Sequence, residues 1–146
     1  MSGTFRLSMK ARQRLFVNGA VLRFDRRVGV ELLNDAVFLI ESHVLQPSEI
    51  TTPLKQVYFI AQAMLMDPTC ASNARPALFK NLEDLRVGFK DARMIAGLDA
   101  VGQNIGEGRI LEALKRLRGL FALEAELLGL APPAVEQRLS DDMVAA

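Results

Sequence analysis

The chain has 146 residues, of which 50% are hydrophobic and 24% are charged, and its formal net charge is +1. One domain of this size holds enough apolar residues for a core, which excludes a disordered polyelectrolyte and a long multi-domain protein. The longest stretch without a charged residue, 56–66, is shorter than the ~18 residues of a membrane-spanning helix, and the first residues lack the apolar core of a secretory signal, so a cytoplasmic protein without membrane contact is expected.

The first 46 residues show the two-residue period of β-strands. Apolar and polar residues alternate over 5–10, as expected of a strand with one face in water. Two further apolar runs flank Asn18-Gly19, a dipeptide that favours the positive φ angles of a type I′ hairpin turn. Residues 28–40 contain two more runs around a second turn dipeptide, Asn34-Asp35. The pattern predicts an antiparallel meander of four or five strands.

The period changes to that of α-helices near residue 47. Thr51-Thr52-Pro53 supplies an N-cap threonine and a proline at the first helical position, and apolar residues then recur at intervals of three and four. A polar loop is expected to lead to a second helix at Arg75-Pro76. Its continuation carries five glycines over 88–108, which predict breaks or kinks. The last helix has a leucine stripe and should end near Gly129.

These elements predict an α+β fold, in which a small N-terminal antiparallel β meander packs against a C-terminal bundle of three to four helices. The expected organisation is a basic β-sheet lobe over residues 1–46, a helical lobe over 47–130 and a flexible acidic tail over 131–146.

A search for catalytic chemistry gives weak signals. Cys70, the one cysteine, lies in a predicted loop, and His43, the one histidine, lies beside a predicted strand, so nothing in the sequence joins them as a nucleophile and base. The glycine-rich run 102–108 has no preceding strand and no Gly-Lys-Ser/Thr, so a connection between helices is predicted there. The sequence therefore predicts no enzyme, no metal and no cofactor.

Basic residues are concentrated near the amino end. Residues 1–30 hold seven basic residues and one acidic residue, whereas 119–146 hold one basic and five acidic residues. Gathered on one surface, the seven cations would engage several nucleic-acid phosphates. A solvated face that keeps the sheet soluble is the alternative. The candidate RNA-binding residues are Arg12, Arg14, Arg26 and Arg27, with support from Arg6, Lys10 and Arg23.

Other residues were weighed for the same role. Phe5, Phe16 and Phe24 alternate onto the apolar side of the strands, where core packing is expected in place of base stacking. The last helix carries four cations beside its leucine stripe, which predict a solvated flank or a second strip of phosphate contacts. These four are Arg109, Lys115, Arg116 and Arg118.

Two segments in fixed order resemble the FlbT family of flagellin post-transcriptional regulators in flagellated bacteria. The first is Phe16 to Leu22 followed by Asp25-Arg26-Arg27, and the second is Thr51-Thr52-Pro53 with Tyr58-Phe59, Gln62 and Met66-Asp67-Pro68. The resemblance spans residues 5–130. It implies a regulator that associates with the 5′ untranslated region of flagellin mRNA and represses translation or promotes mRNA decay during flagellum assembly, although some relatives act positively, often with a small FlaF-type partner.

Two hypotheses of different classes follow. In the first, the basic strands bind the flagellin mRNA leader while the helices form a core. In the second, the protein is an adaptor or chaperone that binds flagellin or a FlaF-type protein through its helical half, with the last helix and the acidic tail as the docking face. A homo-oligomer stays open in both, because an edge strand or an exposed leucine face would favour one.

Overall fold

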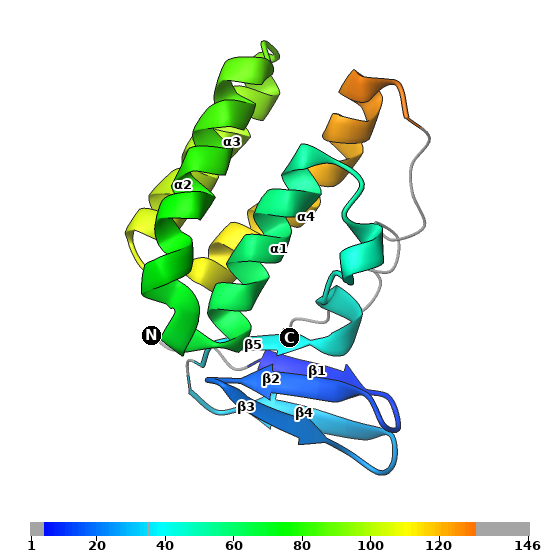
Figure 1. Ribbon diagram of the computed structural model, residues 1–146. Coiled ribbons are helices and arrows are strands. Elements are labelled where there is room, and N and C mark those ends of the chain that lie inside the picture. Colours follow the sequence, from blue (N-terminus) through cyan, green and yellow to red (C-terminus); the bar gives the residue numbers. More distant parts are fainter. Residues whose placement is uncertain (1–4, 35, 131–146) are drawn as a thin grey trace.

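The computed structural model describes residues 5–34 and 36–130 and confirms the α+β fold. In that part of the chain, five strands lie at one end and four α-helices at the other (Figure 1). The strands are β1 (Phe5–Met9), β2 (Arg14–Val17), β3 (Ala20–Arg23), β4 (Val28–Leu32) and β5 (Phe38–Ile40). The helices are α1 (Pro53–Met66), α2 (Ala71–Gly88), α3 (Ala92–Gly106) and α4 (Ile110–Leu128), with 3-10 turns at Glu41–His43, Pro47–Glu49 and Pro68–Cys70. The expected tail, 131–146, lies outside the described residues.

The strands form two sheets instead of one meander. β2 and β3 make the hairpin predicted at Asn18-Gly19, whose φ angles of 49° and 86° are those of a type I′ turn. β1 pairs with β4, however, and β5 joins the other side of β2, so the sheet orders are β1-β4 and β3-β2-β5. The prediction of a single meander was therefore wrong. The chain turns at Arg12, with φ 66°, between β1 and β2, so these two strands lie in different sheets, which pack against each other. Asn34 therefore lies in the segment that leads from β4 in one sheet to β5 in the other, and Asp35 lies outside the described residues.

β2 is covered on both faces, because successive side chains of a strand point to opposite sides. Leu15 is 1% exposed and packs with Leu7, Met9 and the other residues of the cluster between the sheets. Phe16 is 5% exposed and belongs to the larger cluster formed with the helices. Phe24 packs against the smaller cluster, so Phe16 and Phe24 are core residues as predicted, while the Phe5 side chain lies outside the described part.

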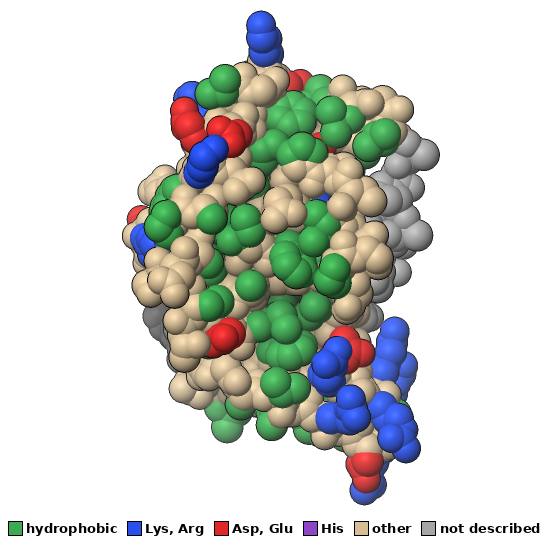
Figure 2. Space-filling model, viewed as in Figure 1, with side chains coloured by type: hydrophobic (Ala, Val, Ile, Leu, Met, Phe, Trp, Pro, Cys, Tyr) green, Lys and Arg blue, Asp and Glu red, His purple; other side chains and the backbone are tan. Residues whose placement is uncertain are grey.

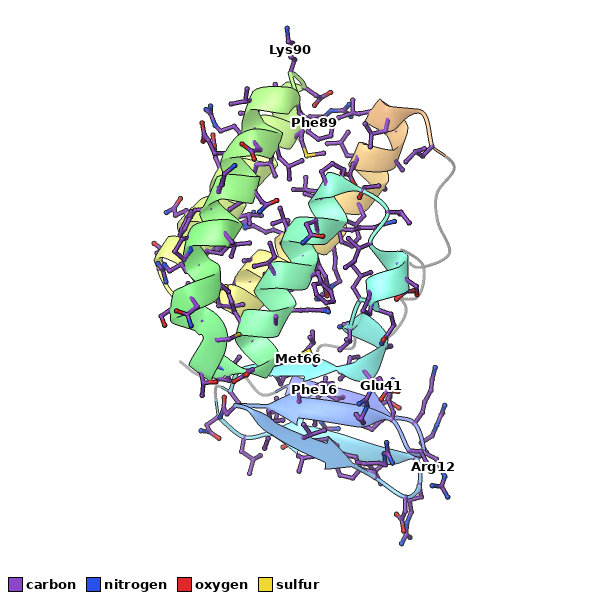
Figure 3. The ribbon with its side chains drawn as sticks, viewed as in Figure 1. Arg12, Phe16, Glu41, Met66, Phe89 and Lys90 are labelled. Atoms are coloured by element: carbon purple, nitrogen blue, oxygen red, sulfur yellow. The ribbon has the colours of Figure 1, made fainter. Side chains whose placement is uncertain are left out.

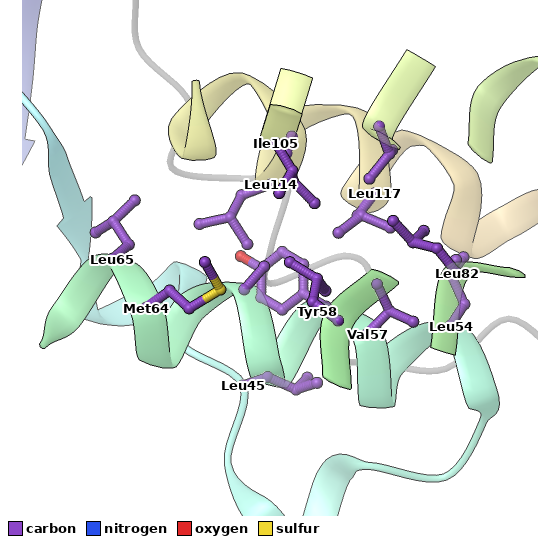
Figure 4. Packing of buried hydrophobic residues seen from close by; sticks show 14 of the residues in the cluster. Leu45, Leu54, Val57, Tyr58, Met64, Leu65, Leu82, Ile105, Leu114 and Leu117 are labelled. Atoms are coloured by element: carbon purple, nitrogen blue, oxygen red, sulfur yellow. The ribbon is translucent and has the colours of Figure 1, made fainter. Parts of the chain in front are cut away.

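α1 is the central helix of the larger core. It begins as predicted, with Thr52 as N-cap accepting from the Lys55 N–H at 3.3 Å and Pro53 at the first position. Its apolar face packs against α2 and α4, and Figure 4 shows Val57 and Tyr58 facing Leu114 and Leu117 of α4.

One expectation about the later helices was wrong, and another was confirmed in part. α2 begins at Ala71, before Arg75-Pro76, because Ala71 and Ala74 pack against the core and extend the helix back to the Pro68–Cys70 turn. Pro76 therefore lies inside α2. The breaks expected at Gly88 and Gly106 are confirmed, because α2 and α3 end there, but α3 runs through Gly97 and Gly102 without one. A Cβ at Gly97 would lie 2.6 Å from Leu120 Cδ2, so the missing side chain lets α3 approach α4 closely. α4 ends as predicted, with Gly129 left-handed at φ 70°.

Polar side chains of α1 fix the segment that follows β5. The Gln62 side-chain amide accepts from the Leu45 N–H at 2.8 Å and donates to the Leu45 carbonyl at 2.7 Å. The Tyr58 hydroxyl donates to the His43 carbonyl at 2.6 Å and accepts from Arg118 Nη1 at 3.0 Å. The main chain leaving the strands is therefore hydrogen-bonded to the centre of the helical lobe.

A buried carboxylate from α4 caps α1. Glu124 is 1% exposed, and it accepts from the Leu54 N–H at 2.9 Å and from the Thr52 hydroxyl. These contacts satisfy the first turn of α1, where main-chain N–H groups have no partner within the helix. Burial raises the pKa of Glu124, against the opposing effects of these hydrogen bonds and of nearby Lys55.

Two glycines of α3 provide a matched test of the α3–α4 contact. We expect Gly97→Ala to be less stable than Gly102→Ala by about 1–2 kcal/mol, because only the first methyl group displaces Leu120, whereas nothing lies within 4 Å of a Cβ at Gly102. Urea unfolding of the two variants measures the difference. Equal free energies of unfolding would contradict the close approach.

The capping carboxylate predicts a pH dependence of stability. Because the folded pKa of Glu124 is raised, its contribution to the free energy of unfolding is present below its ordinary pKa and falls as pH rises through the folded pKa. Glu124→Gln should therefore become more stable relative to the parent as pH rises from about 4 to about 7. Glu126→Gln, which removes an exposed carboxylate from the same helix, is the control. Parallel stability curves for the parent and Glu124→Gln, measured by urea unfolding, would rule out this linkage.

Candidate nucleic-acid interface

Two turns lie together at one end of the strands. The first joins β1 to β2 and the second joins β3 to β4, and the Arg12 N–H donates to the Phe24 carbonyl at 2.7 Å between them. Figure 3 shows Arg12 at this end, and Figure 2 shows Lys and Arg side chains gathered there. We call the cations of these turns and the adjoining strand ends the basic tip. It consists of Lys10, Arg12, Arg14, Arg23, Arg26 and Arg27.

The structure thus brings six of the seven predicted cations together and leaves one apart. Arg6 lies in β1, four residues before Lys10, or about 13 Å along the strand. It forms an ion pair with Glu31 of the neighbouring strand at 3.1 Å. Arg6 therefore contributes little positive potential at the tip.

Carboxylates neutralise part of the tip. Arg14 forms an ion pair with Glu41 through Nε and lies 5.6 Å from the centre of the Phe16 ring. Arg26 lies 3.5 Å from its neighbour Asp25, but both side chains are exposed, and such a pair contributes little. In the described part of the chain, no ion pair involves the three remaining arginines of the tip. These are Arg12, Arg23 and Arg27.

Glu41 also explains how two arginines lie side by side. Arg14 and Arg23 are directly opposite each other on β2 and β3, an arrangement that is destabilising for like charges. The Glu41 carboxylate accepts from both the main-chain N–H and the side chain of Arg14. One charge of the pair is thereby compensated and Arg23 is left exposed at the surface. Sequence reasoning missed Glu41, since no local pattern marks a partner 27 residues away.

Arg12 is held in an uncommon backbone conformation. Its φ of 66° is left-handed, a region that costs most L-residues about 1 kcal/mol or more and glycine almost nothing. The side chain is exposed. An arginine at a position that favours glycine points to a role for its charge.

Three of the four cations weighed on the last helix make side-chain contacts. Arg116 Nε donates to the Asn104 side chain at 3.0 Å, Arg118 donates to the Tyr58 hydroxyl, and Lys115 lies 3.6 Å from Glu112. Arg109 and Arg116 are exposed all the same, so a second strip of phosphate contacts on α4 stays a prediction. The described part of the tip also carries no exposed aromatic side chain that could stack on a base.

Cys70 and the glycine-rich run 102–108, the other residues considered in the sequence, have structural roles. Cys70 Sγ donates to the Ala63 carbonyl at 3.5 Å, where α1 meets α2. The glycine-rich run forms the end of α3 and its connection to α4, with Gly108 at φ 76°. Over residues 5–34 and 36–130, no three His, Cys, Asp or Glu side chains gather as metal ligands. None of the helices described has both the length and the apolar character needed to cross a membrane.

Comparison with known proteins identifies relatives of the whole folded part. The family model described as "Flagellar protein FlbT" matches residues 5–128. The chain is 48% identical over 128 residues to a probable flagellum biosynthesis repressor protein FlbT of Chelativorans sp. (strain BNC1), covering 88% of each chain. It is 49% identical over 130 residues to the protein of that name from Brucella anthropi, covering 89% of this chain and 86% of the relative. No solved structure matches the chain.

The conformation of Arg12 gives a test that separates charge from backbone strain. We expect Arg12→Gly to be more stable than Arg12→Ala by about 1 kcal/mol, because only glycine adopts the left-handed region at low cost. Both variants lose the same charge and should elute from heparin at the same, lowered salt concentration. Urea unfolding and heparin chromatography measure the two effects. Unchanged elution of both variants would remove Arg12 from the anion-binding surface.

Proposed function

The chain belongs to the FlbT family of flagellar proteins, and from this premise we propose that it is a cytoplasmic repressor of flagellum biosynthesis that binds the 5′ untranslated region of flagellin mRNA through the basic tip. The observation that carries the proposal is the meeting of two turns whose cations outnumber the carboxylates Asp25 and Glu41. Bound to the leader, the protein would hinder translation or promote decay of the message. No covalent bond is made or broken in this mechanism.

The chemistry of the tip suits phosphate binding. A guanidinium group donates two parallel hydrogen bonds to phosphate oxygens, and it keeps its charge at every physiological pH. Arg12 and Arg27 are exposed on adjoining turns, so neighbouring phosphates of one strand can be bound together. Each neutralised phosphate releases counterions, and binding should therefore weaken steeply with salt.

Recognition through the tip would depend on the shape of the RNA. Phosphate contacts fix the position of a protein on nucleic acid and carry no direct sequence information. The exposed side chains of the tip are mostly cationic, and Phe24 is partly buried against the core. We therefore expect the protein to favour a folded leader, in which loops or bulges set the spacing of phosphates.

The second candidate function is an adaptor or chaperone for flagellin or a FlaF-type protein. The leucine stripe of α4 is not its docking face, because Leu114, Leu117 and Phe121 are buried in the core. Exposed apolar side chains instead lie at the end of the helices far from the strands, where α2 and α4 end (Figure 1) and where Figure 2 shows hydrophobic side chains at the surface. They include Val87, Leu127, Leu128 and Leu130. A protein partner could bind this surface, so the adaptor function stays the alternative.

A double variant tests the RNA interface. Arg26→Ala with Arg27→Ala should weaken binding to a flagellin leader RNA and lower the salt slope by up to about 2, because two phosphate contacts are lost. Lys80→Ala with Lys90→Ala removes the same charge from the helical lobe and should change neither quantity. Gel-shift titration at two salt concentrations, against the leader and a scrambled RNA of equal length, measures both.

The same titration distinguishes the two functions. Binding of the double variant with the affinity and salt slope of the parent would remove the tip from the interface. Absence of any RNA retention by the parent, together with co-elution of purified flagellin, would favour the adaptor. Variants at Leu127 and Leu128 should then abolish the co-elution.

A further inference from the structure

The helices and the β1-β4 sheet cover the two faces of β2, but they leave β3 exposed. Val21 and Leu22 lie opposite Phe16 and Leu15 of β2, yet they are 57% and 43% exposed whereas their partners are buried. All four residues of β3 are exposed. Since Val21 and Leu22 point to opposite faces, the strand offers apolar side chains on both faces of the sheet.

The outer edge of β3 is also open. The order β3-β2-β5 leaves one side of β3 without a partner strand among residues 5–34 and 36–130. A two-residue hairpin turn makes Val17 and Ala20 a hydrogen-bonded pair, and pairs then alternate along the ladder. The main-chain N–H and C=O of Val21 and of Arg23 therefore point away from β2. Edges of this kind are usually blocked by a charged residue, a proline or a bulge, and none of these stands at Val21 or Leu22.

We infer that this edge pairs with the same edge of a second copy, antiparallel and centred on Val21. Only residues whose main-chain groups point outward can form hydrogen-bonded pairs, so a two-fold axis must pass through a residue and not between two residues. Val21 and Leu22 are the two interior residues of β3, and centring on either keeps most of the strand paired. Centring on Val21 places Val21 opposite Val21 of the partner and Leu22 opposite Ala20, so apolar side chains meet on both faces. Arg23 then lies opposite Gly19, the small residue of the turn.

The charges of the tip select this arrangement over the others. A parallel pairing would place two basic tips side by side. Centring on Leu22 would place Arg23 opposite Val21 and bring the two Arg23 residues within about 7 Å of each other along the strand. Centring on Val21 separates the two Arg23 residues by about 14 Å, which exceeds the Debye length of about 8 Å at physiological salt. Antiparallel pairing at Val21 therefore joins the apolar residues and keeps the cations apart.

The dimer would have one continuous sheet of six strands, three from each copy, with a basic tip at each of its two ends. Only a short segment pairs, so the affinity should lie in the micromolar range. The pairing does not depend on RNA binding, and its test uses no RNA.

Sedimentation velocity of the full chain tests the assembly. We expect a monomer–dimer equilibrium that shifts across the micromolar range, and Val21→Lys should raise the dissociation constant at least tenfold, because the two-fold axis would bring the two lysines together. Val87→Lys is the control, since Val87 is 71% exposed on α2, and it should dimerise as the parent does. A parent that stays monomeric into the high micromolar range, or a Val21→Lys variant that dimerises normally, would overturn the proposal.

Cysteine cross-linking tests the register in a Cys70→Ser background. Val21→Cys should form an intermolecular disulfide with oxidised glutathione, because residues of a hydrogen-bonded pair have Cα atoms about 5.5 Å apart, within the range of a disulfide. Arg23→Cys should not, because its two copies lie about 14 Å apart. Faster linkage through Leu22→Cys or Arg23→Cys than through Val21→Cys would overturn the register.

Discussion

The hydrogen bonds between the side chains of Tyr58 and Gln62 in α1 and the main chain of His43 and Leu45 determine where the strands lie relative to the helices. A buried amide or hydroxyl left without partners would cost about 1–3 kcal/mol, so these bonds strongly favour one placement of the segment. β5 comes just before it and pairs with β2, which brings Phe16 against the helices. The β2–β3 hairpin and the basic tip follow from this placement.

Charged groups divide into two kinds in this molecule. Glu124 and Lys55 are buried at the start of α1, where the carboxylate completes the hydrogen bonds of a helix end. The arginines of the tip remain in water, where a charge keeps its hydration until a ligand replaces it. The near-neutral total of +1 therefore conceals a protein with a strongly cationic end. A polyanion arriving from solution would first meet this end.

Features set by neighbouring residues could be predicted from the sequence, and those set by distant residues could not. Asn18-Gly19 specifies its own turn, and Thr52-Pro53 specifies its own helix start, because the deciding interactions are local. The pairing of β1 with β4, the start of α2 at Ala71 and the cap from Glu124 each depend on packing across the fold. The same division holds at the tip. The run of cations was visible in the sequence, whereas the pairing of Arg14 with Glu41 needed the folded chain.

The hydrogen bond between the Arg12 N–H and the Phe24 carbonyl has a consequence for the thermodynamics of association. Separate flexible loops lose conformational freedom when they close around a ligand, and that loss reduces affinity. Here the two turns are tied to each other when the protein folds, so the backbone at the tip is ordered before any ligand arrives. Only the long side chains of the cations remain to be immobilised, and the entropic penalty of docking is confined to their rotamers.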